Sequence, residues 1–292
     1  MWYDQAAREL DAVVKYPAMV FPLLRLVEIP PLHRKSLREA AINYVCRSAE
    51  IDTSTYGEVL RGEGVLINMT PGGLLTVKRE TWPEYNIVHR AMVDFVTDLG
   101  LVKTCKEGQL PFCVHVITPK MARNPEINQR PHSTHKMHTD IWAGQPRDLL
   151  HLWIPIRGAF NGVSCEWYEP QEFPFDLIRR FENYSDPLLA PIVANAKKYD
   201  VDIDFDMAYV SHGFALHRTV LKSDITDLGR LTLDVRFRLN NGQDTSAHKE
   251  YAPIKEWLDT GTSKAYVDDT SVNNFRNMRK EWPKSSMIRP LK

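Results

Sequence analysis

The residues most capable of chemistry lie in a short segment, His138-Thr139-Asp140, which His217 follows about eighty residues later. On a β-strand, side chains two positions apart point to the same face, so His138 and Asp140 can reach one ion together. A second histidine from a distant strand then completes a face of two imidazoles and one carboxylate. This donor set, with its other positions open, is typical of non-haem iron(II) oxygenases. The sequence therefore predicts a metal site at His138, Asp140 and His217.

A histidine two positions before an acidic residue is not specific by itself, because the chain has 10 histidines and 37 aspartates and glutamates. A second such pair, His248-Lys249-Glu250, lies in a polar stretch without apolar alternation, which is typical of solvated surface. His212 is an alternative to His217 as the third ligand. His151 is expected near the site as a partner of a ligand, since ligating imidazoles need a partner for their other nitrogen.

The segment after Asp140 has the pattern of short strands separated by turns. A Gly-Gln-Pro turn at 144–146 precedes the strand-like run 149–156, and Asn161-Gly162 predicts a hairpin into the next strand. Many short strands with turn signals favour a sandwich or barrel, and the jelly roll is the type that houses such metal sites. The further strands predicted by this pattern cover 163–168, 203–211, 213–220 and 230–239.

The last of these strands alternates polar and apolar residues with a period of two. The apolar face is predicted to lie in the core and comprises Leu231, Leu233, Val235, Phe237 and Leu239. The opposite face carries Arg230, Thr232, Asp234, Arg236 and Arg238. A buried arginine needs an anion, so this face is a candidate binding surface.

Over about residues 110–240 the chain resembles the iron(II)/2-oxoglutarate-dependent oxygenases, nearest in pattern to the phytanoyl-CoA hydroxylase-like branch. The matching segments are His138-x-Asp140, Trp153-Ile-Pro-Ile156, Ser211-His-Gly-Phe-Ala-Leu-His217 and Arg230-x-Thr232. The resemblance implies a mainly β fold with flanking helices around a double-stranded β-helix (jelly-roll, cupin-like) core. It also implies iron(II), 2-oxoglutarate as co-substrate, and O₂.

In this resemblance His138, Asp140 and His217 hold the iron and are the catalytic residues, while Arg230 and Thr232 bind the far carboxylate of 2-oxoglutarate. Arg236 is a rival anchor on the same face, about 20 Å further along the strand. Trp142, which follows the ligand pair, is expected at the mouth of the pocket. Trp142 and Arg236 are therefore the candidate substrate contacts.

The implied reaction is hydroxylation of a small molecule of natural-product type, with release of succinate and CO₂. One alternative is a 2-oxoglutarate oxygenase that acts on a protein or peptide side chain. The other is a jelly roll that binds metal without being an oxygenase, as an isomerase or a binding module. These classes differ in whether the metal-loaded protein consumes 2-oxoglutarate.

The bulk composition predicts a soluble cytoplasmic enzyme. Lysine plus arginine equals aspartate plus glutamate at 37 each, so no nucleic-acid footprint is expected. The N-terminus is charged and amphipathic rather than a signal peptide, and prolines and Lys15 interrupt the apolar stretch near it, so no membrane span is expected. The four cysteines have no paired spacing and are predicted to be free thiols.

The chain is predicted to be a single oxygenase domain over 1–292. Its N-terminal part, 1–105, is expected to be mainly helical. The jelly-roll core is expected over 106–240 with a helical insert at 170–199, and a C-terminal extension over 241–292. The helices predicted from apolar periodicity within the N-terminal part cover 2–15, 33–49 and 83–99.

Overall fold

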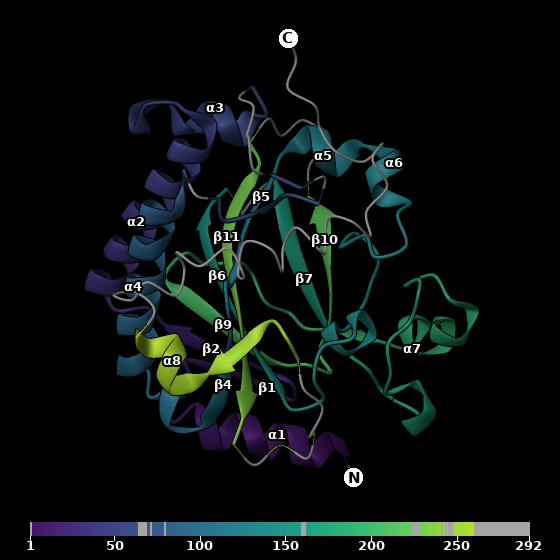
Figure 1. Cartoon of the computed structure of the whole chain (residues 1–292). Coiled ribbons are helices and arrows are strands. Elements are labelled where there is room, and N and C mark those ends of the chain that lie inside the picture. The colour runs from purple at the N-terminus through teal and green to yellow at the C-terminus, as the bar shows by residue number, and fades with distance from the viewer. Residues whose placement is uncertain are drawn as a thin grey trace.

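The fold is built on two antiparallel sheets, as a computed structural model shows (Figure 1). The structure describes residues 2–259 except 64–68, 71, 79, 159–161, 223–227, 241, 243 and 245–247. Most of the predicted C-terminal extension, 260–292, therefore lies outside the described residues, as does Asn161 of the predicted hairpin.

Nine of the described strands form a large sheet in the order β1-β2-β9-β6-β11-β4-β12, with β5 on β11 and β3 on β5. Strand β11 is its centre, because it pairs with β6 along one edge and with β4 and β5 along the other. The strands of this sheet are β1 Met19–Phe21, β2 Leu24–Glu28, β3 Leu74–Leu75, β4 Cys105–Gln109, β5 Cys113–Ile117, β6 Leu149–Arg157, β9 Met207–His212, β11 Arg230–Leu239 and β12 Tyr251–Pro253.

A smaller sheet of three described strands has the order β10-β7-β8. Its strands are β7 Val163–Glu169, β8 Lys197–Lys198 and β10 Leu216–Leu221. In Figure 1, β7 and β10 lie beside the large sheet on the side away from α2 and α4. The mainly β class with flanking helices and a jelly-roll core, expected from the sequence, is confirmed.

The predicted hairpin between the strands 149–156 and 163–168 is wrong. Strand β6 already pairs with β9 along one edge and with β11 along the other, so no edge is left for β7. The chain instead passes from the large sheet to the small one between these strands.

The outer face of the large sheet is covered by helices. Leu231, Leu233 and Val235 of β11 share one buried cluster with apolar residues of α2 and α4, which confirms the predicted core face of that strand. Three helices of this region begin and end close to the predicted bounds, whereas α3 was not predicted. A glycine, Gly100, follows α4 at φ 79° as expected. They are α1 Trp2–Val13, α2 Pro31–Ala49, α3 Tyr56–Arg61 and α4 Trp82–Asp98.

The N-terminal part also contributes strands that the apolar periodicity did not indicate. Strand β2 is only five residues long and pairs along its whole length with β9, so it extends the sheet at that edge. Four of its five residues, including Arg25, are buried, so its burial does not follow the polar–apolar alternation by which a strand is recognised in a sequence. Among the described residues, no helix is both long and apolar enough to cross a membrane.

The predicted helical insert at 170–199 is mostly not helical. Its described helical parts are two three-residue 3₁₀ turns and one short α-helix, α7 Ala190–Ala194. Prolines at 170, 174, 187 and 191 explain this, since proline lacks an amide hydrogen and disfavours helix in the residue before it. The remaining short helices are α5 Pro119–Arg123, α6 Pro125–Asn128 and α8 Ile254–Asp259.

The central position of β11 leads to a prediction about stability. Leu233 is fully buried between the sheet and the covering helices, so Leu233→Ala should lower the free energy of unfolding by about 2–5 kcal/mol. Urea unfolding measures this loss. As a control, Leu188→Ala removes a side chain that is 54% exposed and should change stability by less than about 0.5 kcal/mol. Equal effects of the two variants would contradict the assigned core.

Candidate metal centre

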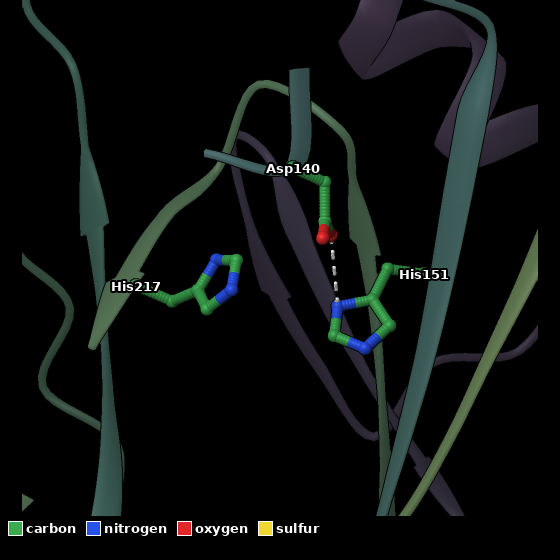
Figure 2. A group of neighbouring side chains, drawn as sticks. All are labelled: Asp140, His151 and His217. Carbon is green, nitrogen blue, oxygen red and sulfur yellow. Dashed lines mark ion pairs between the residues drawn. The ribbon is translucent and has the colours of Figure 1, made fainter. Parts of the chain in front are cut away.

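Three side chains from separate elements converge on one space inside the fold (Figure 2). Asp140 begins a 3₁₀ turn, His151 comes from β6 of the large sheet, and His217 comes from β10 of the small sheet. Each offers one ligand atom, and these atoms all lie within 4.8 Å of one another. One carboxylate and two imidazoles at this separation can hold a transition-metal ion.

Two of the three predicted ligands, Asp140 and His217, belong to this cluster, and the third, His138, adjoins it. The backbones of His138 and His217 are hydrogen-bonded to each other in both directions, at 2.9 and 3.1 Å. Their rings are 4.4 Å apart between centroids, and the ring of Tyr184 stacks on His138 at the same distance. The sequence expected His151 only as a neighbour, whereas the structure places it within the cluster.

His138 and His217 are oriented in the same way. The Nδ1 atom of His138 lies 2.8 Å from the carbonyl oxygen of Lys136, and that of His217 lies 3.2 Å from the carbonyl oxygen of Ala215. A proton on Nδ1 satisfies each of these carbonyls, which leaves the lone pair of each neutral ring on Nε2. Both rings therefore have a nitrogen available for a metal.

The segment from His138 to Asp140 is not the regular strand that was predicted. Thr139 is extended, and Asp140 already begins a 3₁₀ turn, Asp140–Ala143. The hydroxyl of Thr139 caps this turn by accepting a hydrogen bond from the amide of Trp142 at 3.3 Å. Gly144 ends it at φ 91°, a conformation that side chains other than glycine rarely adopt. The tight turn brings Asp140 next to His151 and His217, and these three potential ligands are called the metal cluster below.

Trp142, expected at the mouth of a pocket, lies in a buried apolar cluster in this structure. Its side chain is fully buried, and its indole nitrogen donates to the carbonyl of Leu177 at 3.2 Å. Phe173 and Phe181 pack against it, with ring centroids at 5.7 and 6.2 Å. Trp142 is a core residue beside the site.

Arg236 is bound to Asp140. Its Nε and Nη2 atoms donate to the same carboxylate oxygen, Oδ1, at 3.1 and 2.8 Å. The other oxygen, Oδ2, faces Nδ1 of His151 at 3.4 Å. Burial alone would raise the pKa of Asp140, but Arg236 and His151 outweigh it and hold the pKa well below the usual range. Arg236, a candidate substrate contact from the sequence, is thus hydrogen-bonded to Asp140, a predicted metal ligand.

His212, the alternative third ligand, lies outside the cluster. Its Nε2 atom is 3.1 Å from a carboxylate oxygen of Glu9 in α1, and the residue is buried there at the end of β9. His217 follows the turn after β9 and lies on the small sheet, next to His138. The spacing of five residues therefore separates the two histidines onto different sheets.

Arg230 is buried without a carboxylate partner among the described residues. Its Nη1 donates to the carbonyl of Ser164 at 2.5 Å and its Nη2 to the hydroxyl of Thr219 at 3.0 Å. Within the described part of the chain its Nε has no hydrogen-bond partner, and neither does the Oγ atom of Ser164. Burial lowers the pKa of Arg230. The guanidinium also lies over the ring of Trp153, 5.8 Å from its centroid. None of these described partners carries a negative charge, so the buried cation is suited to bind an anion.

The position of Arg230 relative to the metal cluster follows from β10. Thr219 is two residues after His217 on that strand, so the two side chains share a face and lie about 7 Å apart along it. Because Arg230 donates to Thr219, its guanidinium lies one such step from the cluster. This matches the predicted anchoring role better than Arg236, which reaches Asp140 directly.

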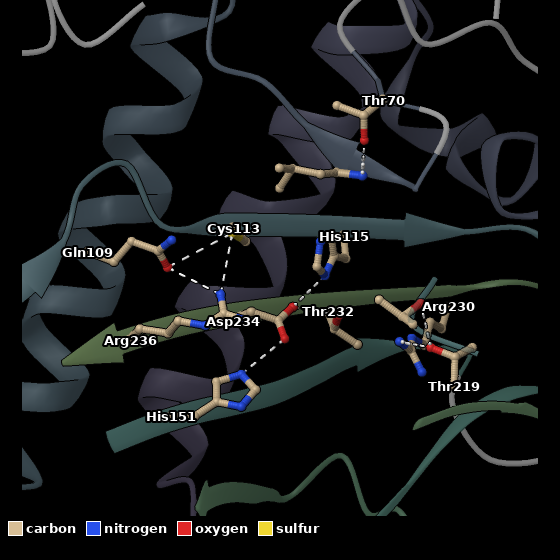
Figure 3. Close-up of polar contacts among 12 residues, drawn as sticks. Thr70, Gln109, Cys113, His115, His151, Thr219, Arg230, Thr232, Asp234 and Arg236 are labelled. Carbon is tan, nitrogen blue, oxygen red and sulfur yellow. Dashed lines mark hydrogen bonds and ion pairs between the residues drawn. The ribbon is translucent and has the colours of Figure 1, made fainter. Parts of the chain in front are cut away.

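Thr232 does not assist Arg230 as predicted. Its hydroxyl is fully buried and donates to Oδ2 of Asp234 at 3.2 Å (Figure 3). Asp234 and its partner His115 were not recognised as site residues from the sequence. The period-two pattern did place Asp234 on the polar face of β11, but it gave no indication that His115 lies on the neighbouring strand.

No family model and no curated protein matches the chain. Among solved structures, it is similar to the non-haem monooxygenase ThoJ in a nickel complex, at 14% identity, TM-score 0.43, and coverage of 93% of this chain and 96% of that one. It is also similar to SnoK, a non-haem alpha-ketoglutarate-dependent carbocyclase from nogalamycin biosynthesis, at 12% identity, TM-score 0.46, and coverage of 85% and 95%. A third similar structure is AviO1 from Streptomyces viridochromogenes Tue57, at 13% identity, TM-score 0.43, and coverage of 84% and 98%.

Burial of the histidines leads to a prediction about pH. It lowers the pKa of His138 to about 3 and those of His89 and His135 to about 4. In the unfolded chain these rings titrate near pH 6.5, so from about pH 6.5 to 5 the unfolded state binds protons that the folded state does not. The metal-free protein should therefore lose stability as the pH falls through this window, by up to about 1.4 kcal/mol per pH unit for each ring.

Urea unfolding between about pH 5 and 7 measures this slope. His138→Gln should reduce the slope by one ring's share, whereas Leu188→Ala, on the surface, should keep that of the wild type. A slope that is unchanged in His138→Gln would show that this ring does not remain neutral in the folded protein.

Proposed function

We propose that this protein is a non-haem iron(II) and 2-oxoglutarate-dependent oxygenase that hydroxylates a small molecule. The observation that carries the proposal is the buried Arg230, which has no carboxylate partner among the described residues and lies one strand step from the cluster of Asp140, His151 and His217. A metal site and an anion site at this separation suit a ligand that chelates a metal with one end and presents a carboxylate at the other.

The donor set fits iron(II). Imidazole nitrogens and a carboxylate oxygen are ligands that this ion accepts, and a face of two histidines and one carboxylate leaves positions open for co-substrate and O₂. The Nδ1 atom of His151 is buried without a hydrogen-bond partner among the described residues, so its lone pair is available to a metal. We assign His138, Asp140 and His217 as the ligands predicted by the sequence motif.

The Arg230 site fits the far carboxylate of 2-oxoglutarate. A carboxylate can accept from the guanidinium and from the Ser164 hydroxyl, whose oxygen has no hydrogen-bond partner among the described residues. It would also neutralise the buried cation. The Thr219 hydroxyl and the Ser164 carbonyl fix the guanidinium between the two sheets.

When bound, iron(II) with 2-oxoglutarate and O₂ supplies the oxidation, in which the co-substrate leaves as succinate and CO₂. The residues of the chain have separate tasks in this proposal. The Nδ1 bonds of His138 and His217 aim their Nε2 atoms at the metal, and Arg236 occupies Oδ1 of Asp140, so that Oδ2 remains for the metal. Burial of the site limits the access of water.

The metal ligands can be tested by iron(II) titration under anaerobic conditions. We expect the wild type to bind one iron per chain. Asp140→Ala and His217→Ala should each lose iron binding, because each variant removes one of the three proposed protein ligands. His212→Ala is the matched control: it removes a buried histidine five positions away that is bonded to Glu9, and should keep the metal. The reverse result, with iron lost only in His212→Ala, would overturn the ligand assignment.

The same anaerobic sample tests the enzyme class. Addition of 2-oxoglutarate to the iron-loaded wild type should produce a weak visible charge-transfer band. A metal-loaded protein that neither develops this band nor forms succinate from 2-oxoglutarate would instead be a metal-binding jelly roll without oxygenase activity.

The anchor of 2-oxoglutarate can be tested by titrating it into two variants. Arg230→Ala should weaken binding by roughly two orders of magnitude or more, because removal of one partner of a buried charge pair costs about 3–5 kcal/mol. Arg230→Lys should restore little, because a single ammonium does not reproduce the two-pronged guanidinium. Metal affinity should be nearly unchanged in both variants.

Arg236→Ala provides the contrast, since Arg236 contacts Asp140 and no anchor role is proposed for it. It should reduce metal affinity first and 2-oxoglutarate binding only as a consequence. Normal 2-oxoglutarate affinity in Arg230→Ala, with a direct loss in metal-saturated Arg236→Ala, would transfer the anchor to Arg236.

A further inference from the structure

The ring of His151 lies between two buried carboxylates. Its Nδ1 atom is 3.4 Å from Oδ2 of Asp140, and its Nε2 atom is 3.3 Å from Oδ1 of Asp234. All three residues are at most 5% exposed. The two carboxylates differ in their surroundings, because only Asp140 adjoins the other potential metal ligand, His217.

The position of Asp234 follows from the register of three strands. On β11 it lies between Thr232, which pairs with His115 of β5, and Arg236, which pairs with His151 of β6. Residues two apart on a strand share a face, so Asp234 is the diagonal neighbour of both histidines. Figure 3 shows its carboxylate between them.

The oxygens of Asp234 already have partners. Oδ1 meets His151, while Oδ2 lies 3.0 Å from Nδ1 of His115 and accepts from the Thr232 hydroxyl at 3.2 Å. Burial alone would raise the pKa of Asp234, but His115 and His151 outweigh it and hold the pKa well below the usual range. The residue is therefore an ionised acceptor that can only receive hydrogens.

We propose that Asp234 is a positioning residue for the metal site: it accepts the Nε2–H of His151 and so presents the Nδ1 lone pair of that ring as a further donor beside Asp140. A neutral imidazole carries one proton, so fixing it on Nε2 determines which nitrogen faces the metal. The Nδ1 atom is the buried one without a hydrogen-bond partner in the described part of the chain. This inference rests on the proposed metal site. It makes His151 an alternative to His138 as the second imidazole, since His151 belongs to the cluster of ligand atoms and His138 adjoins it, so the positions for 2-oxoglutarate and O₂ stay open.

The consequence is a site in which two kinds of imidazole differ in their supporting group. His138 and His217 each direct Nδ1 to a backbone carbonyl, whereas His151 directs Nε2 to a carboxylate. A carboxylate behind a ligating histidine makes the ring more basic, and its loss typically weakens metal binding by 10–100-fold. His151 should therefore depend on its partner more than the other two histidines do.

The first test needs no metal. Imidazole ¹⁵N NMR of the metal-free wild type should show His151 protonated on Nε2. In Asp234→Asn the amide can accept from Nε2 or donate to it, so the preference for one tautomer should be lost. An unchanged His151 tautomer in this variant would overturn the proposal.

The second test measures cobalt(II) affinity by calorimetry, together with the visible ligand-field spectrum of the bound ion. Asp234→Asn should weaken binding by about 10–100-fold and change the spectrum. Asp148→Asn is the matched control, because Asp148 is an equally buried carboxylate paired with Arg238 at 3.1 Å and is absent from the metal cluster. Both variants should lose thermal stability, but only Asp234→Asn should alter the metal.

A double variant separates action through His151 from a general structural effect. If Asp234 acts through this ring, His151→Ala with Asp234→Asn should bind cobalt no more weakly than His151→Ala alone. Additive losses, or equal losses in Asp234→Asn and Asp148→Asn, would overturn the positioning role while leaving the metal site intact. A wild-type protein that binds no divalent metal would overturn the proposed function as well.

Discussion

The ion pair between Arg236 and Asp140 is the interaction on which the site depends. It joins the central strand of the large sheet to the turn that begins at Asp140, with the carboxylate buried and the guanidinium half-buried. A buried charge is tolerated only when it is paired and hydrogen-bonded, so the inner face of β11 determines what can lie opposite it. Arg238 follows the same rule with Asp148, and Asp234 with its two histidines.

Arg230 is the exception on this face, and the exception has a physical meaning. The other charged side chains of β11 have partners of opposite sign or histidines, while the described contacts of Arg230 are to two neutral oxygens and the ring of Trp153. The free energy needed to bury that guanidinium must be offset by the rest of the fold until an anion binds. Among the charged residues of this strand, Arg230 is therefore the one best suited to bind an anion.

The potential metal ligands also connect the two sheets, because they come from both of them. His151 belongs to the large sheet and His217 to the small one, while Asp140 comes from the turn that precedes β6. An ion bound by all three would link the two layers at a place where the described contacts are polar. Because a metal that binds only the folded state stabilises it by mass action, binding of an ion at this site would be coupled to folding of the core.

The sequence by itself determined the features that depend on local pattern. Period-two alternation placed the apolar face of 230–239 in the core, and apolar periodicity located the helices α1, α2 and α4, because both signals arise within one element. Asp140 and His217 were also found as a pair of potential ligands. The turn at Asp140 escaped detection because one threonine cap and one glycine are enough to replace a strand.

Only the tertiary structure decided which side chains meet across elements. The placement of His151 in the metal cluster and of His115 beside Asp234 depends on the register of β6 and β5 against β11, and a shift of one residue would reverse the face of each. The pairing of Arg236 with Asp140, rather than with a substrate, depends on the path of a turn almost a hundred residues earlier. Such contacts arise from packing between layers, which no spacing along the chain encodes.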